Sequence, residues 1–266
     1  MNSTNGYIEK LYQILKAGGY QRTLHYHNTP SFYGKLYEKQ LEYIAEHYVS
    51  LNLKNLSLKL QRDTFEHPDK KSILIGLFDG YRNNYEVLYP MLGRYGLTAW
   101  YLLVSDFLNT PVKEQEKMLE PYHMQYIVGE YEDRRYAMSW EEAREVSRKH
   151  VIVNHSSTHY FITSDTDEKR VCYEIDHAHG MIEKNTGTRP VVFSALGGAD
   201  FYTNPTVSKK LREKGYQYMI GYCLENIAIQ DKRDITENVP YEDTVFLDEA
   251  QVEQEIIYYQ IVMDRV

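Results

Sequence analysis

The sequence predicts an α/β fold built on a parallel sheet, either an α/β barrel or an open sheet. Stretches of helical pattern alternate with stretches of strand pattern, and the connections between them are short. The run SILIGLF at 72–78 is almost wholly apolar, as expected of a strand buried on both faces. Several predicted strands are followed at once by histidine or aspartate, the residue types that bind metal ions at strand ends.

Between residues 22 and 105 the sequence predicts three strands and two helices. Residues 22–28 alternate and are β-prone, which predicts a strand ending near His27. Apolar side chains recur at helical spacing over 36–48, and 85–95 is expected to be a second helix. The apolar run TAWYLLVS at 98–105 is expected to form the strand after 72–78.

The second half continues the alternation. Ser139 and Glu142 form a capping-box pattern that opens a helix over 139–150, and Gly187 ends another. Pro205 stands at the first position of a third helix, where its missing N–H leaves no bond unmade. The expected elements are helices at 139–150, 172–187 and 204–215 and strands at 151–154, 190–195 and 216–222.

A single domain is expected for the 266 residues, because a chain of this length buries enough surface to fold as one unit. Three segments depart from the alternation: a helical N-terminal extension at 1–20, an insertion at 106–138 with a short helix, and a C-terminal strand segment at 249–266. Residues 231–248 are polar and are expected to be a loop.

Composition and charge exclude some classes of function. A net charge of −8 argues against binding to nucleic acid, which needs a basic face. No stretch has the length of a membrane span, and the N-terminus lacks the pattern of a signal peptide. The sequence as written therefore indicates a cytoplasmic protein, or a secreted or cell-surface one if a leader has been removed. It does not indicate an oligomeric state.

The segment HSSTH at 155–159 carries the strongest sign of chemistry. Histidines four residues apart lie on one face of a helical turn, so His155 and His159 can turn ring nitrogens towards the same cation. Asp79, which follows the strand at 72–78, would complete a site of two histidines and one carboxylate. Histidine pairs with this spacing also occur on solvent-exposed faces without a metal, so both interpretations stay open.

Other histidines have less distinctive surroundings. His27 follows a predicted strand, and a lone histidine there is more often a hydrogen-bonded structural residue than a catalyst. Alternation along that strand puts His25 on the same face, as a candidate pocket residue. His177 and His179 share a helix with Glu174 and Asp176, and the four are expected to form a solvated polar face rather than a second metal site.

Taken together and in order, these segments resemble the NodB-type polysaccharide deacetylases, carbohydrate esterase family 4. The resemblance is nearer to the subgroup that deacetylates poly-β-1,6-N-acetylglucosamine, in which an N-terminal YH motif supplies the acid histidine. It covers roughly residues 22–222 and implies an irregular (β/α)7-type barrel. The matching segments are LHYHN (24–28), YEKQLEYI (37–44), LFDGYRNNYEVLYPMLGRYGLTAWYLL (77–103), SWEEAREVSRKHVIVNHSSTH (139–159) and RPVVFSALGGAD (189–200).

The resemblance implies a reaction and assigns residues to it. Asp79, His155 and His159 would bind one divalent metal, with Zn²⁺ the expected ion, and the metal would activate a water molecule. His27 would be the acid that protonates the leaving amine. The reaction would remove an acetyl group from an N-acetylated oligosaccharide or polysaccharide.

The sequence departs from the family pattern at two places. Phe78 stands where the family has its general base, and losing a positioned base costs about 10²- to 10⁴-fold in rate. The loop after 190–195 lacks the family's aromatic residues, although the backbone N–H of Gly197 could still serve as an oxyanion donor. His25, Phe78 and Asp200 are expected to line the substrate pocket.

Three interpretations follow. The first is an active metal-dependent deacetylase, weakened by Phe78, in which Asp106 or Asp200 could replace the base, although both fit a turn or helix cap better. The second is a catalytically inactive relative that acts as a carbohydrate-binding or regulatory module. The third, a metal-free scaffold, is the least favoured because all three ligand positions are filled.

Overall fold

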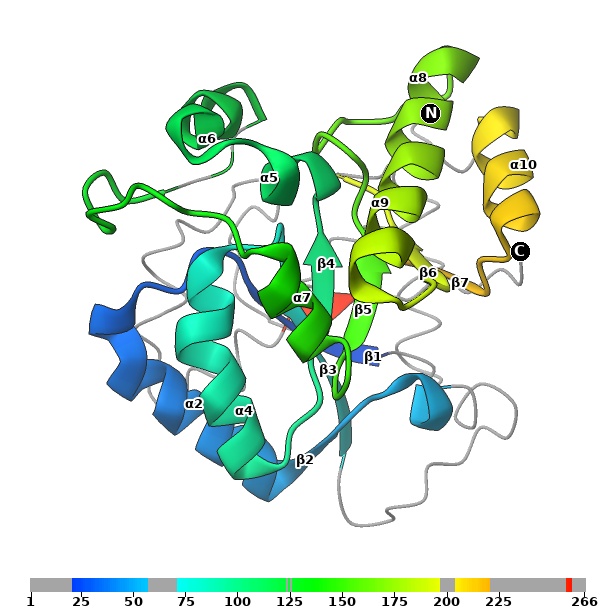
Figure 1. The fold of residues 1–266 in the computed structure, drawn as a ribbon. Coiled ribbons are helices and arrows are strands. Elements are labelled where there is room, and N and C mark those ends of the chain that lie inside the picture. The colour runs from blue at the N-terminus through cyan, green and yellow to red at the C-terminus, as the bar shows by residue number, and fades with distance from the viewer. Residues whose placement is uncertain are drawn as a thin grey trace, which may run out of the picture.

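The computed structural model describes residues 21–56, 71–122, 124, 126–196, 204–220 and 257–259. Its strands form one sheet in the order β7-β6-β5-β4-β3-β1-β8, and β2 pairs with β3 outside that path. All pairs are parallel except β1 with β8, which is antiparallel. The sheet is a curled half-barrel of parallel strands with helices packed on it, consistent with the expected α/β fold (Figure 1).

The strands are short. They span Gln21–Tyr26 (β1), Tyr48–Ser50 (β2), Lys71–Leu77 (β3), Trp100–Leu103 (β4), Val151–Asn154 (β5), Val192–Ser194 (β6), Tyr218–Ile220 (β7) and Ile257–Tyr259 (β8). Six of them lie at the predicted positions along 22–222, and β8 lies within the predicted C-terminal segment as an edge strand beside β1. The short strand β2 was not predicted.

The helices pack around the sheet. They span Gly34–His47 (α2), Tyr89–Tyr95 (α4), Ser105–Asn109 (α5), Val112–Leu119 (α6), Trp140–Val146 (α7), Glu168–Cys172 (α8), Ala178–Thr186 (α9) and Pro205–Lys214 (α10). Short 3-10 turns cover Ser31–Tyr33 (η1) and Glu120–Tyr122 (η3). In Figure 1, α2 and α4 lie side by side at one end of the sheet, and α8, α9 and α10 cover the other end.

Two helices differ from their predicted form. The helix expected at 85–95 begins with a π-helical turn, Asn84–Leu88 (η2), before α4. The helix expected at 172–187 begins earlier, at Glu168, where the side chain of Asp167 accepts a hydrogen bond from Arg170 N and caps α8. A second π-helical turn, Tyr173–His177 (η4), joins α8 to α9.

Both faces of the sheet are buried, which explains the apolar character of the strands. Along β3, Ile73, Ile75 and Leu77 pack into a core shared with α2 and α4. Leu74 points to the opposite face, into the interior of the half-barrel, where it joins a second cluster that includes Trp100 of β4. The indole N–H of Trp100 is not left unpaired, because it donates to Leu51 O at 2.7 Å.

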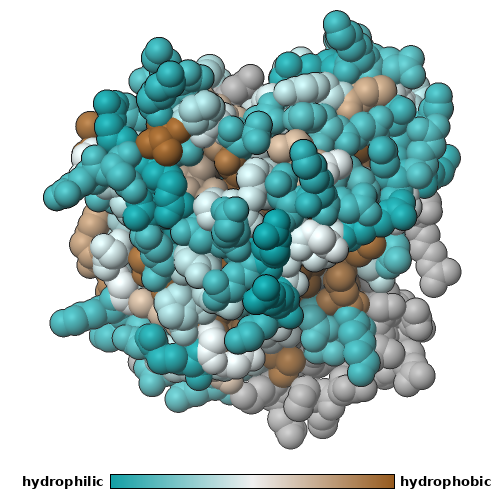
Figure 2. Space-filling model, in the orientation of Figure 1, coloured by the Kyte–Doolittle hydropathy of each residue, from teal (hydrophilic) through white to brown (hydrophobic). Residues whose placement is uncertain are grey.

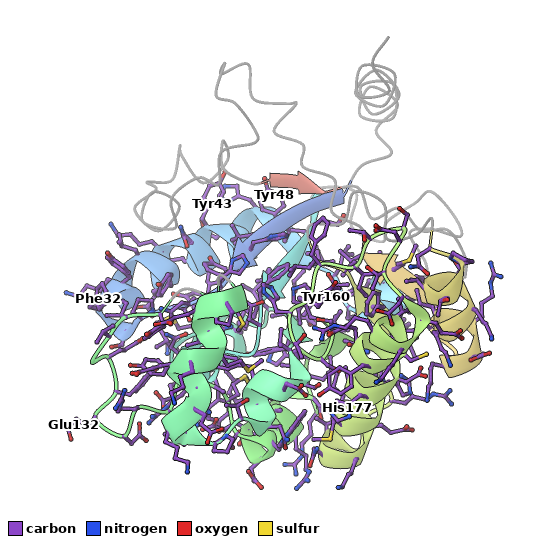
Figure 3. All side chains as sticks on the ribbon, turned by 90° about the horizontal axis from the view of Figure 1, so that it is seen from above. Phe32, Tyr43, Tyr48, Glu132, Tyr160 and His177 are labelled. Atoms are coloured by element: carbon purple, nitrogen blue, oxygen red, sulfur yellow. The ribbon has the colours of Figure 1, made fainter. Side chains whose placement is uncertain are left out.

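The predicted insertion contains α5 and α6 and is fastened to the chain after β3. Arg82 N donates to Tyr136 O, and Met138 N donates to Gly80 O. Within the insertion, the side-chain oxygen of Gln115 accepts hydrogen bonds from Tyr136 N and Ala137 N. A cluster of buried apolar residues lies beneath this segment. Phe32 and Glu132, both exposed, lie at the same margin of the molecule in Figure 3.

The face in Figure 2 is mainly hydrophilic, and apolar side chains appear on it only in small, separate patches. Among the described residues, no helix combines the length and the apolar character that a membrane crossing requires. The helix expected within 1–20 and the loop expected at 231–248 lie outside the described residues. The count of seven β/α units and the single-domain boundary stay predictions.

His150, in the connection between α7 and β5, generates a prediction about stability in acid. Its Nδ1 accepts a hydrogen bond from Ala99 N at 3.1 Å, and burial, helped by Lys149, lowers the pKa of His150 to about 4. In the unfolded chain the pKa of His150 is near 6.5, so below that pH the unfolded state binds more protons than the folded state. The contribution of His150 is therefore complete above pH 6.5 and is lost as the pH falls towards 4.

We expect the His150→Asn protein to lose about 2 kcal/mol less stability than the wild type between pH 7.5 and pH 5. Urea unfolding of both proteins at the two pH values, with a chelator present, measures this difference. Equal losses in the two proteins would contradict the prediction.

Candidate metal centre

The candidate metal centre lies where the carboxyl ends of neighbouring strands meet. Asp79 follows β3, and His155 follows β5, two strands along the sheet. Because β3, β4 and β5 run parallel, both residues emerge at the same edge of the sheet. His155 N donates to Leu103 O at 3.0 Å, which continues the β4–β5 ladder into the first residue after β5.

Three of the predicted side chains converge on one point. Asp79 Oδ1 lies 3.3 Å from His159 Nε2 and 3.7 Å from His155 Nε2. One donor atom from each of the three residues lies within 4.8 Å of the other two. The exposed fraction is 1% for Asp79 and 3% for His155, so these two groups are nearly sealed from solvent.

The donor set suits a cation. Asp79 Oδ1 is buried and has no hydrogen bond of good geometry, although buried carboxylate oxygens normally have one. His155 Nδ1 is bonded to Ser194 O at 2.9 Å, which makes Nδ1 the protonated nitrogen and turns the lone pair of Nε2 towards Asp79. The three groups could therefore hold a divalent metal.

The protonation states also fit. Burial acts to raise the pKa of Asp79, but the facing His159, with His27 and His155, lowers that pKa to about 2. Burial, reinforced by His159, lowers the pKa of His155 to about 4. At neutral pH the site thus offers a carboxylate and a neutral imidazole, the forms that bind metals.

The segment HSSTH is not the helical turn that its spacing suggested. It is a loop in which Ser156 (φ 72°) and His159 (φ 60°) both adopt left-handed backbone conformations. Ser156 N donates to Asn154 Oδ1, and His159 N donates to Ser156 Oγ, so local side chains replace helical hydrogen bonds. The two imidazoles still face one point, with ring centroids 5.2 Å apart.

A tight turn presents Asp79. Its φ is 69°, and the next residue, Gly80, has a φ of 86°. A Cβ on Gly80 would come within 2.6 Å of Leu108, so both the backbone angle and the space require glycine. This turn explains why a glycine directly follows the acid.

Phe78 lies against His25 of β1 and against His27, which directly follows β1. Its ring centroid is 4.4 Å from that of His25, 4.8 Å from that of His27 and 5.4 Å from that of His155. Gly76 makes room for it, since a Cβ there would come 2.7 Å from Cε2 of Phe78. The three side chains form an aromatic wall beside the metal centre, and Tyr26 points to the opposite face, into the core.

Both imidazoles of this wall are held in the neutral form. Burial, with the neighbouring His27, lowers the pKa of His25 well below its usual value. Burial also lowers the pKa of His27, although Asp79 acts in the opposite direction. His27 is therefore close enough to the metal centre for the charge of Asp79 to affect its pKa.

The turn that carries His27 is locked by residues that the sequence did not single out. Asn83 Oδ1 accepts from Thr29 N at 2.8 Å, and Asn84 Oδ1 accepts from Thr29 Oγ1 at 2.9 Å. Asn83 Nδ2 also donates to Asn28 Oδ1 and to Glu130 of the insertion. The adjacent Asn83-Asn84 pair, three residues after Gly80, was the available signal.

Asp106 and Asp200, the candidate replacements for the base, have different outcomes. Asp106 lies in the first turn of α5, where its two oxygens are bonded to Tyr173 Oη at 2.7 Å and His177 Nε2 at 3.2 Å. It is not among the three residues that converge on the metal centre. Asp200 and Gly197 lie outside the described residues.

The solvated polar face expected on the helix at 172–187 is wrong for two of its four residues. Glu174 is fully buried, and His179 is 3% exposed. His179 Nδ1 is bonded to Tyr216 Oη at 2.9 Å, and Asn154 Nδ2 donates to the same oxygen at 2.7 Å. The face looked solvated because its partners come from distant parts of the chain. His177, labelled in Figure 3, is by contrast half-buried and ends η4.

Comparison with known proteins agrees with this geometry. Residues 66–219 match the profile of the family described as Polysaccharide deacetylase. A putative polysaccharide deacetylase of Bacillus subtilis (strain 168), YxkH, is 34% identical over 76 residues, which are 28% of this chain. The match spans only 26% of that relative's length.

Two solved structures show a similar fold. The de-N-acetylase from Aggregatibacter actinomycetemcomitans superposes with a TM-score of 0.57 at 16% identity, covering 84% of this chain and 98% of that one. The Streptococcus pyogenes deacetylase PplD, in complex with acetate, superposes with a TM-score of 0.55 at 15% identity, covering 74% of this chain and 81% of that one. At these identities the likeness concerns the fold.

The converging donor atoms predict stoichiometric metal binding. We expect one divalent ion per chain after dialysis against trace Zn²⁺, and none in the His155→Ala protein, because a neutral nitrogen donor is lost. Elemental mass spectrometry measures the content. His177→Ala serves as the control, since this half-buried histidine is not one of the converging donors. Equal metal content in wild type and His155→Ala would contradict the assignment.

Proposed function

Because the chain belongs to the polysaccharide deacetylase family, we propose that it is a metal-dependent hydrolase that removes the acetyl group from an N-acetylated amino sugar. The observation that carries this proposal is the convergence of Asp79, His155 and His159 on one point at the carboxyl edge of the sheet. The substrate would be an oligosaccharide or polysaccharide, as the family name indicates. Poly-β-1,6-N-acetylglucosamine is the specific candidate, because the YH motif ends in His27 beside the site.

The three donors would hold one divalent ion, for which Zn²⁺ is the proposed identity. When bound, such an ion polarises an amide carbonyl and makes water a nucleophile near neutral pH. The carboxylate of Asp79 and the two imidazoles orient the ion, and the hydrogen bond from His155 Nδ1 to Ser194 O keeps one ring fixed. Two nitrogens and one oxygen leave coordination positions open for substrate.

His27 is the proposed acid. Its ring is part of the aromatic wall beside the metal centre, and Asp79 and His159 both influence its pKa. Because its ring is neutral, His27 must first take up a proton from solvent water; it can then give that proton to the amine as the carbon–nitrogen bond breaks, which prevents expulsion of an unstable amide anion. The Asn83-Asn84 hydrogen bonds to Thr29 hold the turn after His27 and thereby the position of its ring.

Phe78 limits the rate in this proposal. An apolar ring cannot accept a proton from the attacking water, and Asp106, the described alternative base, has both oxygens bonded elsewhere. We propose slow turnover for this reason, with the missing base costing about 10²- to 10⁴-fold.

A second candidate function, a carbohydrate-binding or regulatory module, is favoured by the fit of Phe78 itself. Gly76 supplies the space for the ring, and the neutral rings of His25 and His27 flank it. Apolar and aromatic surfaces are suited to stacking against sugar rings. A wall packed in this way is compatible with binding that does not lead to hydrolysis.

Restoring the base separates the two functions. We expect the Phe78→Asp protein to release acetate from N-acetylglucosamine oligomers at least about 10²-fold faster than the wild type, because the carboxylate can accept the proton. Acetate measured over time after addition of Zn²⁺ gives the rate. The double variant Phe78→Asp with Asp79→Asn should lose the gain, since the metal centre is then incomplete.

If the wild type instead binds the oligomers saturably without releasing acetate, the binding function holds and the hydrolase proposal is wrong. Isothermal titration with the same oligomers measures that binding. Absence of both binding and release in the wild type and in Phe78→Asp would contradict both functions.

A further inference from the structure

A fully buried carboxylate lies behind the histidine loop. Glu174 belongs to the π-helical turn η4 and has no exposed surface. Its charge is balanced by Arg170, whose Nη2 lies 2.8 Å from Glu174 Oε1 one turn earlier along the chain. A buried charge is retained in a fold only when several partners satisfy it, so its contacts indicate its role.

The partners of Glu174 are in the loop that carries both histidines. Its Oε2 accepts hydrogen bonds from Ser157 N and Thr158 N, both at 2.9 Å. Its Oε1 accepts a hydrogen bond from Thr158 Oγ1 at 2.7 Å. One carboxylate therefore holds the two residues at the centre of the loop, between His155 and His159.

Further hydrogen bonds join the histidine loop to its neighbours on both sides. Ser157 Oγ donates to Tyr173 O of η4 at 2.7 Å, so a second contact joins the loop to the π-helical turn. On the other side, Ser105 N and Asp106 N donate to Ser156 O and Ser157 O. The loop is held between α5 and η4, and Glu174 supplies the charged part of that support.

This support matters because the loop has an unfavourable backbone. Ser156 and His159 both have positive φ, which costs about 1 kcal/mol or more for a residue other than glycine. Without fixed acceptors for the N–H groups of Ser157 and Thr158, the loop could relax and turn the two imidazoles apart. Charged acceptors form stronger hydrogen bonds than neutral ones.

We propose that Glu174 is a positioning residue for the metal centre. Its carboxylate fixes the N–H groups of Ser157 and Thr158, and thereby keeps His155 and His159 aimed at Asp79 before any metal binds. The inference rests on the metal centre of the proposed function and extends it to a residue that does not touch the metal. Residues that orient metal ligands typically contribute 10- to 100-fold to metal affinity.

Replacement of Glu174 by glutamine tests this role with little change in volume. Glutamine has one acceptor oxygen in place of two, so its NH₂ group must face either the two backbone N–H groups or Thr158 and Arg170. We expect the Zn²⁺ dissociation constant of Glu174→Gln to rise about 10- to 100-fold. Glu168→Gln, an exposed site on α8 with the same change in charge, should leave it unchanged.

The experiment has two readouts. Competition with a chromophoric chelator measures Zn²⁺ affinity, and visible absorption of the Co²⁺-loaded proteins reports ligand geometry at saturation, which a general loss of stability would not change. Circular dichroism of the metal-free proteins verifies the fold. An altered Co²⁺ spectrum together with weaker Zn²⁺ binding supports the inference.

Glu174→Gln with wild-type affinity and an unchanged Co²⁺ spectrum would overturn the inference while leaving the proposed function intact. A wild type that binds no Zn²⁺ would overturn the metal centre itself. If Glu174→Gln does not fold, Thr158→Val decides, because it removes the hydroxyl that donates to Glu174 Oε1 and accepts from Arg170 Nη2, while the carboxylate of Glu174 stays in place. Weaker Zn²⁺ binding by Thr158→Val supports the role of Glu174, and unchanged binding overturns it.

Discussion

The common direction of β3, β4 and β5 is the constraint on which the candidate site depends. Parallel strands end at one edge, so a carboxylate after β3 and a histidine after β5 meet across β4 without any long connection. Burial of both sheet faces keeps the strands in register, because a slip by one residue would exchange the side chains of Ile73 and Leu74 between two separate cores. The packing that makes the fold stable thus also sets the distances in the metal centre.

Much of this arrangement could be predicted from the sequence, because strand position and strand end are local signals. The apolar run ending in Asp79 and the run VIVN before His155 indicated both the sheet and the edge at which these residues meet. The spacing of His155 and His159 predicted the right pair for a wrong reason. A left-handed loop, not a helical turn, brings their rings together, and non-glycine residues give no sequence signal for positive φ.

The buried polar support could not be predicted. A helix with Glu174 on one turn and His179 on another looks amphipathic with a wet face, since charged residues are usually exposed. Only the fold shows that the partners of Glu174 are backbone N–H groups of a loop earlier in the chain. The two π-helical turns, η2 and η4, were not predicted either, because each is a single wider turn within a stretch of helical pattern. Both turns lie against the site, one beside Asp79 and one behind the histidine loop.

Both proposed functions depend on the packing of the Phe78 ring. The ring is not a mismatch tolerated at the surface, because Gly76 leaves space for it and two neutral imidazoles pack against it. The site is therefore well packed at a position whose side chain cannot accept a proton. The geometry of the donors and the chemistry of the wall are separate properties of this molecule, and they can change independently.

The left-handed backbone at Asp79, Ser156 and His159 has an evolutionary consequence. Glycine would adopt each of these conformations without steric strain, so random substitution guided by stability alone would be drawn towards glycine at all three. A serine and two potential metal ligands stand in these places instead, so the chain carries a backbone cost around the candidate metal centre that glycine would avoid.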